Sequence, residues 1–284
     1  MAPGRDENRR LTPPFLEVRN LRFAYGAARA AALAIDDVSF SVGPGEFVSI
    51  VGPSGSGKTT LLRCVSGLMK PSAGEIRLHG DVVADVPAEL AIVFQDYGRS
   101  LFPWLSVHDN VDMPLRRLRL GREERESRIA SALAEVALPE AARKYPWQLS
   151  GGMQQRVAIA RAIAYRPSIL LMDEPFASVD AQTRADLQDT TLEIWRAHGS
   201  TVLFVTHDID EAVYLSDRVV VLSRPPARVE SEIAIDLPRP RDQIETRAAL
   251  RFVELRADVA RLIRRPTPTD ARTPASTDEP AAGA

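Results

Sequence analysis

Features typical of disulfide-rich, membrane-spanning and nucleic-acid-binding proteins are scarce in this sequence. Its 284 residues include one cysteine, Cys64, so no disulfide can form within the chain and no cysteine cluster can bind a metal. No apolar run approaches the roughly 18 residues of a membrane-spanning helix. The net charge of −2 provides no general attraction to nucleic acid. The sequence therefore predicts a cytosolic globular protein that does not bind nucleic acid.

The two ends of the chain differ in composition from its middle. Residues 1–14 are polar and lack the apolar segment of a secretory signal, which predicts a disordered leader. In residues 241–265, apolar side chains from Ile244 to Leu262 recur at steps of three and four, which predicts an amphipathic helix. Residues 266–284 are rich in Pro, Thr, Ala and Asp and predict a disordered tail.

A glycine-rich loop separates a short apolar run, residues 47–51, from a predicted helix, residues 59–66. The loop matches the phosphate-binding pattern G-x-x-x-x-G-K-[ST], and Thr60 follows it: Gly52, Pro53, Ser54, Gly55, Ser56, Gly57, Lys58, Thr59. Glycines let successive N–H groups point at phosphate oxygens, and the helix N-terminus adds partial positive charge. Lys58 can reach the β- and γ-phosphates, and the Thr59 hydroxyl can ligate Mg²⁺. The loop therefore predicts binding of a nucleoside triphosphate.

Polar residues follow three further apolar runs that we interpret as strands. The run 169–172 ends in Asp173 and Glu174, which predicts that Asp173 holds Mg²⁺ through water and that Glu174 orients or activates the attacking water. His207 follows the run 201–205, where a contact with the γ-phosphate is plausible chemistry. Gln95 follows the apolar run 90–94 and is either an ordinary polar strand end or a residue at the mouth of the nucleotide site.

Three other features have two readings each from the residues alone. Tyr25 is either an exposed aromatic at a strand end or a ring that stacks on adenine. Ser150 is a good N-cap, and Gly151 and Gly152 after it belong either to a simple capped helix or to a second phosphate site. The apolar segment 101–105 either packs under its neighbours or meets a partner. We expect the surface that meets a partner to comprise Phe94, Leu101, Phe102 and Trp104.

Five elements occur in one order along residues 15–240, and together they resemble the ATP-binding subunit of ABC transporters. They are the phosphate loop, Gln95, the signature Leu-Ser-Gly-Gly-Met-Gln-Gln-Arg at 149–156, the acids after the strand at 169–172, and His207. The resemblance implies an α/β P-loop NTPase fold with a RecA-like core, an N-terminal antiparallel β subdomain and a helical insertion at about residues 96–164 that carries the signature.

The resemblance also implies roles for individual residues. Lys58, Gln95, Glu174 and His207 would be catalytic, and Thr59, Gln95 and Asp173 would bind Mg²⁺. Besides the phosphate loop with Thr60, the residues that would contact ATP are Tyr25, Ser150, Gly151, Gly152 and Asp180. Two copies would hold ATP between the phosphate loop of one and the signature of the other. The segment ending at Asp180 reads Ala-Ser-Val-Asp, where the family usually has Ser-Ala-Leu-Asp.

Residues 96–104, 173–180 and 236–241 are similar to the nitrate, sulfonate and taurine importer branch of this family. That similarity implies a homodimeric ATPase on the cytoplasmic face of the plasma membrane. Its partners would be membrane-spanning permease subunits and, through them, a solute-binding protein. The alternative is a soluble ABC ATPase of DNA repair or translation. Such proteins have a long coiled-coil insertion or two nucleotide domains, and the sequence predicts neither.

Overall fold

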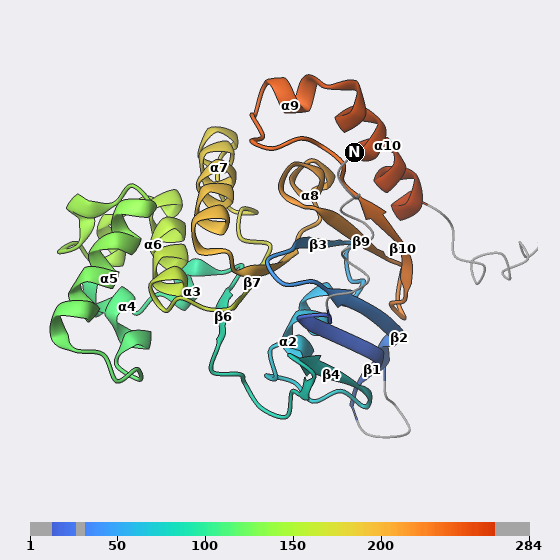
Figure 1. Ribbon diagram of the computed structural model, residues 1–284, viewed down its shortest axis with the longest axis horizontal. Helices are drawn as coiled ribbons and strands as arrows, with labels where there is room; N and C mark the ends of the chain where they lie inside the picture. The colour runs from blue at the N-terminus through green and yellow to red at the C-terminus, as the bar shows by residue number, and fades with distance from the viewer. Residues whose placement is uncertain (1–12, 27–31, 265–284) are drawn as a thin grey trace, which may run out of the picture.

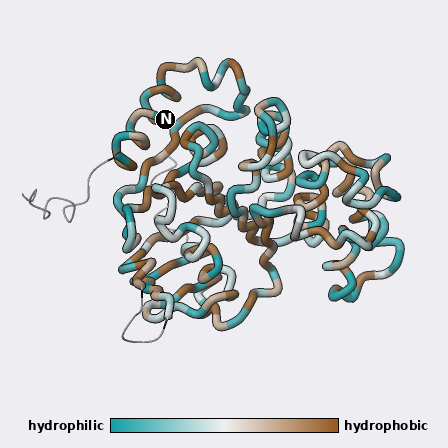
Figure 2. Tube along the Cα trace, turned by 180° about the vertical axis from the view of Figure 1, so that it is seen from behind, coloured by the Kyte–Doolittle hydropathy of each residue, from teal (hydrophilic) through white to brown (hydrophobic). Residues whose placement is uncertain are grey.

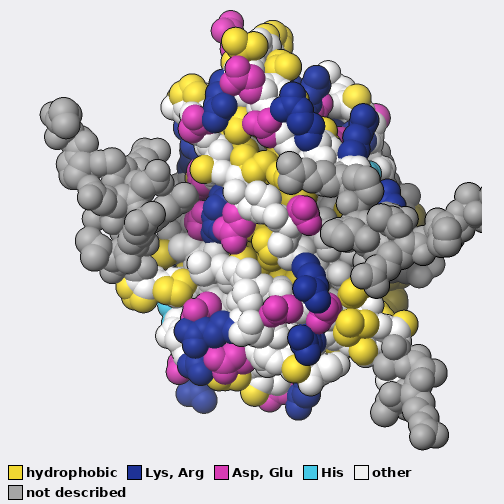
Figure 3. Space-filling view, turned by 90° about the vertical axis from the view of Figure 1, so that its right-hand side faces the viewer, with side chains coloured by type: hydrophobic (Ala, Val, Ile, Leu, Met, Phe, Trp, Pro, Cys, Tyr) yellow, Lys and Arg dark blue, Asp and Glu magenta, His cyan; other side chains and the backbone are white. Residues whose placement is uncertain are grey.

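The computed structural model describes residues 13–26 and 32–264. The predicted tail and all but the last two residues of the predicted leader lie outside this range. Within it, no helix is long and apolar enough to cross a membrane. Acidic and basic side chains are interspersed on the face shown in Figure 3, in keeping with the small net charge.

The described strands form two sheets. An antiparallel sheet has the order β2-β1-β4-β5, and a central sheet has the order β10-β9-β3-β8-β7-β6. The first contains β1 (Leu16–Tyr25), β2 (Ala32–Val42), β4 (Ala73–Leu78) and β5 (Asp81–Val82). The second contains β3 (Phe47–Val51), β6 (Leu90–Val93), β7 (Ile169–Asp173), β8 (Thr201–Val205), β9 (Arg218–Leu222) and β10 (Val229–Ala234). This pairing of sheets is the predicted P-loop NTPase fold.

The central sheet is parallel from β9 to β6, and only β10 runs antiparallel to its neighbour. Every residue of β3, β7 and β8 is buried, as expected for parallel strands that are covered on both faces. Figure 2 shows hydrophobic stretches running through the middle of the molecule, where these strands lie. Because parallel strands end at one edge of a sheet, the loops after β3, β7 and β8 gather there.

A helical lobe lies between β6 and β7 in the chain, and Figure 1 shows it to one side of the central sheet. It consists of α3 (Tyr97–Ser100), α4 (Val107–Leu115), α5 (Arg122–Glu135), the 3₁₀ turns Pro139–Ala141 and Pro146–Gln148, and α6 (Gly151–Ala164). Its apolar side chains join those of the central sheet in one buried cluster. A second cluster joins the antiparallel sheet to α2 (Lys58–Val65).

In the described part of the chain, which ends at residue 264, four helices follow β7, and the last two depart from the prediction of one C-terminal helix. They are α7 (Ala181–His198), α8 (Ile209–Leu215), α9 (Glu245–Ala248) and α10 (Leu250–Arg264). The chain is extended at Ala249, with ψ at 136°, which separates α9 from α10. The two pieces face different neighbours: Arg247 of α9 bonds to Gln188 of α7, whereas Phe252 and Leu255 of α10 are buried in the core.

Candidate functional site

The phosphate loop joins β3 to α2 and leaves the first turn of α2 open. Gly57 precedes the helix with φ at 83°, no side chain caps the first amides, and no acid lies in the first turn. Lys58 is only 6% exposed, and its Nζ donates to the carbonyls of Gly52 (3.0 Å) and Pro53 (3.1 Å). Burial lowers the pKa of Lys58, while Glu174 and Asp173 act in the opposite direction. Open amides beside a buried cation make an anion site.

The loop is tightly packed at one residue, and at another it leaves a polar group unpaired within the described part of the chain. A Cβ at Gly52 would lie 2.9 Å from both the carbonyl of Leu222 and the hydroxyl of Ser56, so a larger residue would spread the loop. The Ser56 hydroxyl is itself buried, with no hydrogen-bond partner among the described residues. Buried hydroxyls are rarely left unpaired, so a phosphate oxygen is a fitting partner.

A pair of oxygen donors lies next to the loop. The hydroxyl of Thr59 donates to Asp173 at 3.2 Å. Burial raises the pKa of the Asp173 carboxyl, and the bond from Thr59 opposes that effect. A nearby cation would favour the ionised form of this carboxylate. Hydroxyl and carboxylate oxygens suit Mg²⁺, which retains several waters and takes few protein ligands. Among the described residues, no group of three or more acids, histidines or cysteines is placed so that it could hold a metal ion by itself.

Three predicted residues meet at one carboxylate oxygen. Glu174 Oε2 accepts a hydrogen bond from Gln95 Nε2 at 3.1 Å and lies 2.9 Å from His207 Nδ1. These side chains follow β6, β7 and β8, three neighbouring strands of the central sheet. Glu174 has a φ of 43° while its N–H donates to the carbonyl of Val205. A positive φ is costly for a residue with a side chain and is often retained at functional sites.

Tyr25 lies beside the phosphate loop at the end of β1. Its hydroxyl is 2.6 Å from the hydroxyl of Thr60 on α2, and its ring meets the ring of Phe23 edge-on at 4.9 Å. The side chain is nevertheless 47% exposed. The ring therefore has a surface available at the mouth of the loop, which is what stacking on a base requires.

The signature and Asp180 lie together at the N-termini of α6 and α7. Ser150 caps α6 and accepts from the N–H of Met153, and Asp180 caps α7 and accepts from the N–H (3.0 Å) and hydroxyl (2.7 Å) of Thr183. These bonds lower the pKa of Asp180. A Cβ on Gly152 would lie 2.5 Å from Cγ2 of Thr183. Thr183 thus joins the two caps.

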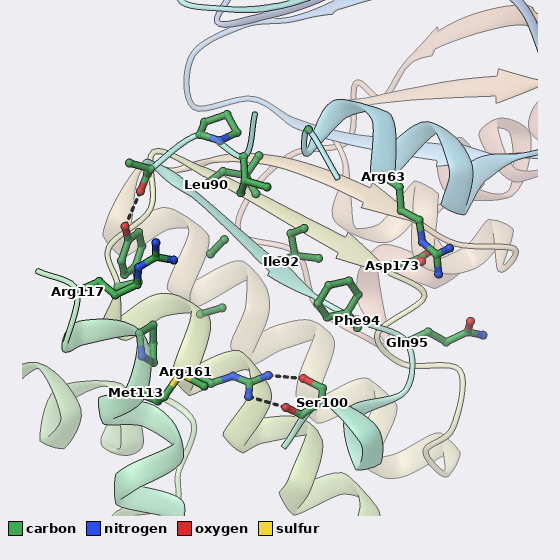
Figure 4. A pocket seen from close by; sticks show the side chains of 18 of the residues that line it. Arg63, Leu90, Ile92, Phe94, Gln95, Ser100, Met113, Arg117, Arg161 and Asp173 are labelled. Atoms are coloured by element: carbon green, nitrogen blue, oxygen red, sulfur yellow. Dashed lines mark hydrogen bonds between the residues drawn. The ribbon is translucent and has the colours of Figure 1, made fainter. Parts of the chain in front are cut away.

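A groove of about 1250 Å³ runs from the phosphate loop to the helical lobe (Figure 4). Thr59, Gln95 and Asp173 line one part of it, and Gly151 and Gly152 are not among its described lining residues. The apolar part of its wall consists of Leu90, Ala91, Ile92, Phe94, Phe102, Met113 and Leu118, among others. Three arginines, Arg63, Arg117 and Arg161, add positive charge, and Arg161 donates to the carbonyl of Ser100.

The partner surface expected from the sequence needs correction. Phe94 and Phe102 line the groove, as expected. Leu101 does not, because it is 2% exposed and packs in the main core cluster. Trp104 is 69% exposed and lies against the Phe102 ring at 5.4 Å, outside the described lining. The wall from α4, which includes Met113, was not foreseen, since its proximity to β6 depends on tertiary packing.

Sequence reasoning also missed a small cavity beside Glu174 and His207, whose lining includes Arg184 and Glu211. Only the cap of α8, at one side of this cavity, had a local sequence signal. Asp208 caps α8 through the N–H groups of Asp210 and Glu211, an arrangement that acids at the start of a helix favour.

This chain is similar in sequence and fold to known proteins. The sequence model of the ABC transporter family matches residues 35–177. The taurine import ATP-binding protein TauB of Sinorhizobium fredii is 43% identical over 244 residues, which cover 84% of this chain and 91% of that one. The bicarbonate transport ATP-binding protein CmpD of Synechococcus elongatus is 42% identical over 258 residues, 90% of each chain. The solved dimer of the ATP-binding cassette MJ0796 with ADP and phosphate is 34% identical, with a TM-score of 0.68, covering 78% of this chain and 98% of that one.

Proposed function

The chain belongs to the ABC transporter family, as an ATP-binding subunit of the importer branch, and from this premise we propose that it energises uptake of a small oxyanion or sulfonate through partner permease subunits. It is an ATPase. The observation that carries the proposal is the convergence of Gln95, Glu174 and His207 beside the phosphate loop. The first amides of α2 and the buried Ser56 hydroxyl there have no side-chain partner among the residues that the structure describes.

ATP is bound by the phosphate loop, with Lys58 and the open amides of α2 on the phosphates and Tyr25 against the adenine. Thr59, Asp173 and Gln95 are the residues that would hold Mg²⁺, which supplies positive charge to the phosphate oxygens when bound. Glu174 accepts the hydrogen bond of the attacking water and aligns it. His207 and Gln95, both within hydrogen-bond reach of Glu174, hold that carboxylate in place.

Two copies of the chain complete the site. Ser150, Gly151 and Gly152 are absent from the described lining of the groove at Thr59 and Asp173 of their own chain, and they serve a nucleotide held by a second copy, with Asp180 beside them. Closure of the dimer excludes water and brings the signature amides to the γ-phosphate. The solved dimer of the cassette MJ0796 with ADP and phosphate supports a dimer of this chain.

The groove receives the permease. Its apolar wall and its continuity with Gln95 suit a short helix of a membrane subunit, so that docking and nucleotide state are linked. The chain then works at the cytoplasmic face of the plasma membrane, and the permease connects it to a solute-binding protein. Met113→Asp in the groove should abolish co-purification with the permease while the isolated chain still binds ATP. Leu250→Asp, at an exposed apolar residue of α10, is the control.

The proposed class of solute rests on sequence similarity to relatives named for transport. The relatives named for taurine and bicarbonate transport handle small solutes with an anionic oxygen group, which supports a cargo of the nitrate, sulfonate and taurine class. A soluble ATPase of DNA repair or translation is the rival. The longest helix in the described part of the chain, α7, has 18 residues, too few for the long coiled coil of such a protein.

The deciding experiment compares ATP hydrolysis and dimerisation of wild type, Glu174→Gln and the control Glu193→Gln, an exposed acid on α7. Glu174→Gln should lose hydrolysis and elute as a dimer in ATP and Mg²⁺, while the control behaves as wild type. Cells that carry Glu174→Gln should also lose uptake of labelled taurine, an alkanesulfonate or nitrate. An unchanged hydrolysis rate in Glu174→Gln would remove Glu174 from the proposed role.

A further inference from the structure

A buried carboxylate lies directly behind the catalytic residues proposed above. A cavity of about 40 Å³ separates them, lined by Glu174, Ala177, Arg184, Thr206, His207, Asp208 and Glu211. That volume holds about one water molecule. Glu211, on α8, is 4% exposed, and the function described so far gives it no role. A carboxylate is rarely buried unless its bonds serve the surrounding structure.

Glu211 is bonded to the segment that carries His207. The hydroxyl of Thr206, the residue before His207, donates to Glu211 Oε2 at 2.7 Å. The same hydroxyl accepts from the N–H of Asp208 at 3.0 Å. The residues on both sides of His207 are therefore fixed to one hydroxyl, and that hydroxyl is fixed to Glu211.

Glu211 also faces the segment that carries Asp180. Its second oxygen lies 3.8 Å from Arg184 Nε and accepts from Gln188 at 3.4 Å. Arg184 in turn donates to the carbonyl of Val179, the residue before Asp180, at 3.2 Å, and lies 3.7 Å from Asp208. One carboxylate thus contacts the supports of two loops: the loop after β8 with His207, and the loop before α7 with Asp180.

We propose that Glu211 is a positioning residue for ATP hydrolysis, whose carboxylate holds Thr206 and Arg184 and thereby sets His207 against Glu174 and Asp180 against the signature. The inference rests on the proposed roles of Glu174 and His207. Its physical basis is that the bond from Thr206 needs only an acceptor oxygen, whereas the attraction to Arg184 needs a negative charge. Glutamine, a neutral side chain of the same shape, retains the bond from Thr206 and loses the attraction to Arg184.

The surroundings of Glu211 make its charge responsive to pH. Burial raises the pKa of Glu211 to about 7, the proximity of Asp208 adds to that shift, and the bond from Thr206 and the charge of Arg184 oppose it. Several charged or titratable groups surround it. Glu174, Arg184, His207 and Asp208 line the shared cavity, Arg247 of α9 reaches it through Gln188, and Arg256 of α10, which packs on α8, lies 3.7 Å from Asp210. Glutamine at this position mimics the protonated carboxyl.

The test is steady-state ATP hydrolysis by the full chain as wild type, Glu211→Gln and the control Glu193→Gln, from about pH 6 to pH 8. At pH 8 we expect Glu211→Gln to lower kcat roughly tenfold with little change in KM, because small misplacements near a reacting centre cost up to about a hundredfold. The ratio of wild-type to variant kcat should fall toward one at pH 6, where wild type is itself protonated. Glu193→Gln should give a ratio near one throughout.

Three results would overturn the proposal: an unchanged kcat at pH 8, a loss that appears in KM alone, or a reduced kcat whose ratio to wild type is independent of pH. The last would mean that the residue serves packing only. Failure of the proposed function looks different, since Glu174→Gln would then keep its activity whatever Glu211→Gln does.

Two further measurements test the proposal if Glu211→Gln folds poorly, or if the chain hydrolyses ATP too slowly in the absence of its partner subunits. Thr206→Val removes the hydroxyl and should reproduce the loss, and Thr206→Ser should restore wild-type behaviour. Hydrogen exchange at one pH near 8 should be faster in Glu211→Gln than in wild type within residues 176–184 and 205–211. Equal exchange in both segments would contradict the proposal without any assay of turnover.

Discussion

The close approach of Gly152 to Thr183 predicts that a substitution at Gly152 lowers stability and that a second substitution, at Thr183, restores it. Gly152 lies in the first turn of α6, where alanine would normally stabilise a helix by up to about 1 kcal/mol. Here the added Cβ would lie 2.5 Å from Cγ2 of Thr183. The methyl cannot swing away freely, since the hydroxyl on the same carbon donates to Asp180 at 2.7 Å. A hydrogen bond to a charged group contributes about 1.5–3 kcal/mol.

Gly152→Ala should therefore lower the free energy of unfolding by about 1–2 kcal/mol, or Tm by roughly 2–6 °C for a chain of this size. Thr183→Ser keeps the hydroxyl and removes Cγ2, so the double variant should return close to wild type. Differential scanning calorimetry of the four proteins without nucleotide measures this separately from phosphate binding. A double variant no more stable than Gly152→Ala alone would refute the assignment of the cost to this contact.

Two other expectations concern stability. Gly74 has φ at +80°, and a Cβ there would lie 2.3 Å from the carbonyl oxygen of Asn20, so Gly74→Ala should cost several kcal/mol in urea unfolding. The control Gly80→Ala, with φ at +87° and open space, should cost about 1 kcal/mol, and equal losses would contradict the steric account. The pKa of Glu211 rises from 4.5 to about 7 on folding, so ionisation opposes folding increasingly from pH 4.5 and fully above pH 7. As the pH rises from 5 to 8, wild type should consequently lose about 2.5 kcal/mol of stability relative to Glu211→Gln, and a stability difference between the two that does not vary with pH would refute this.

Local signals explain what could be predicted from the sequence. The phosphate loop has its own pattern, and the strands around it are continuous apolar runs that end in polar residues. Ser150 as the N-cap of α6 was likewise predictable, because the cap and the periodic residues after it are adjacent in sequence. The positions of Gln95, Glu174 and His207 at neighbouring strand ends followed from the same kind of reasoning.

The features that could not be predicted from the sequence depend on contacts between distant segments of the chain. Leu101 belongs to an apolar loop, and only its packing against the core shows that it is buried. The break at Ala249 contains neither glycine nor proline. It arises because α9 bonds to α7 while α10 packs in the core, and periodicity continues unchanged across it. Glu211 lies in a short helix, and its partners Arg184 and Gln188 come from α7. No local sequence pattern therefore predicts that these three side chains meet.

The register of the central sheet has a consequence for the spacing of the catalytic groups. Val205 of β8 is opposite Ile50 of β3 on one side and Asp173 of β7 on the other. Adjacent strands are about 4.8 Å apart, so the strand before the phosphate loop and the strand before Glu174 are separated by roughly 10 Å. Backbone hydrogen bonds alone determine this separation, which side-chain substitutions in the surrounding helices leave unaltered. Inserting a single residue into β8 would shift His207 relative to both neighbours at once, and we expect such insertions to be far more damaging than insertions in the helical lobe.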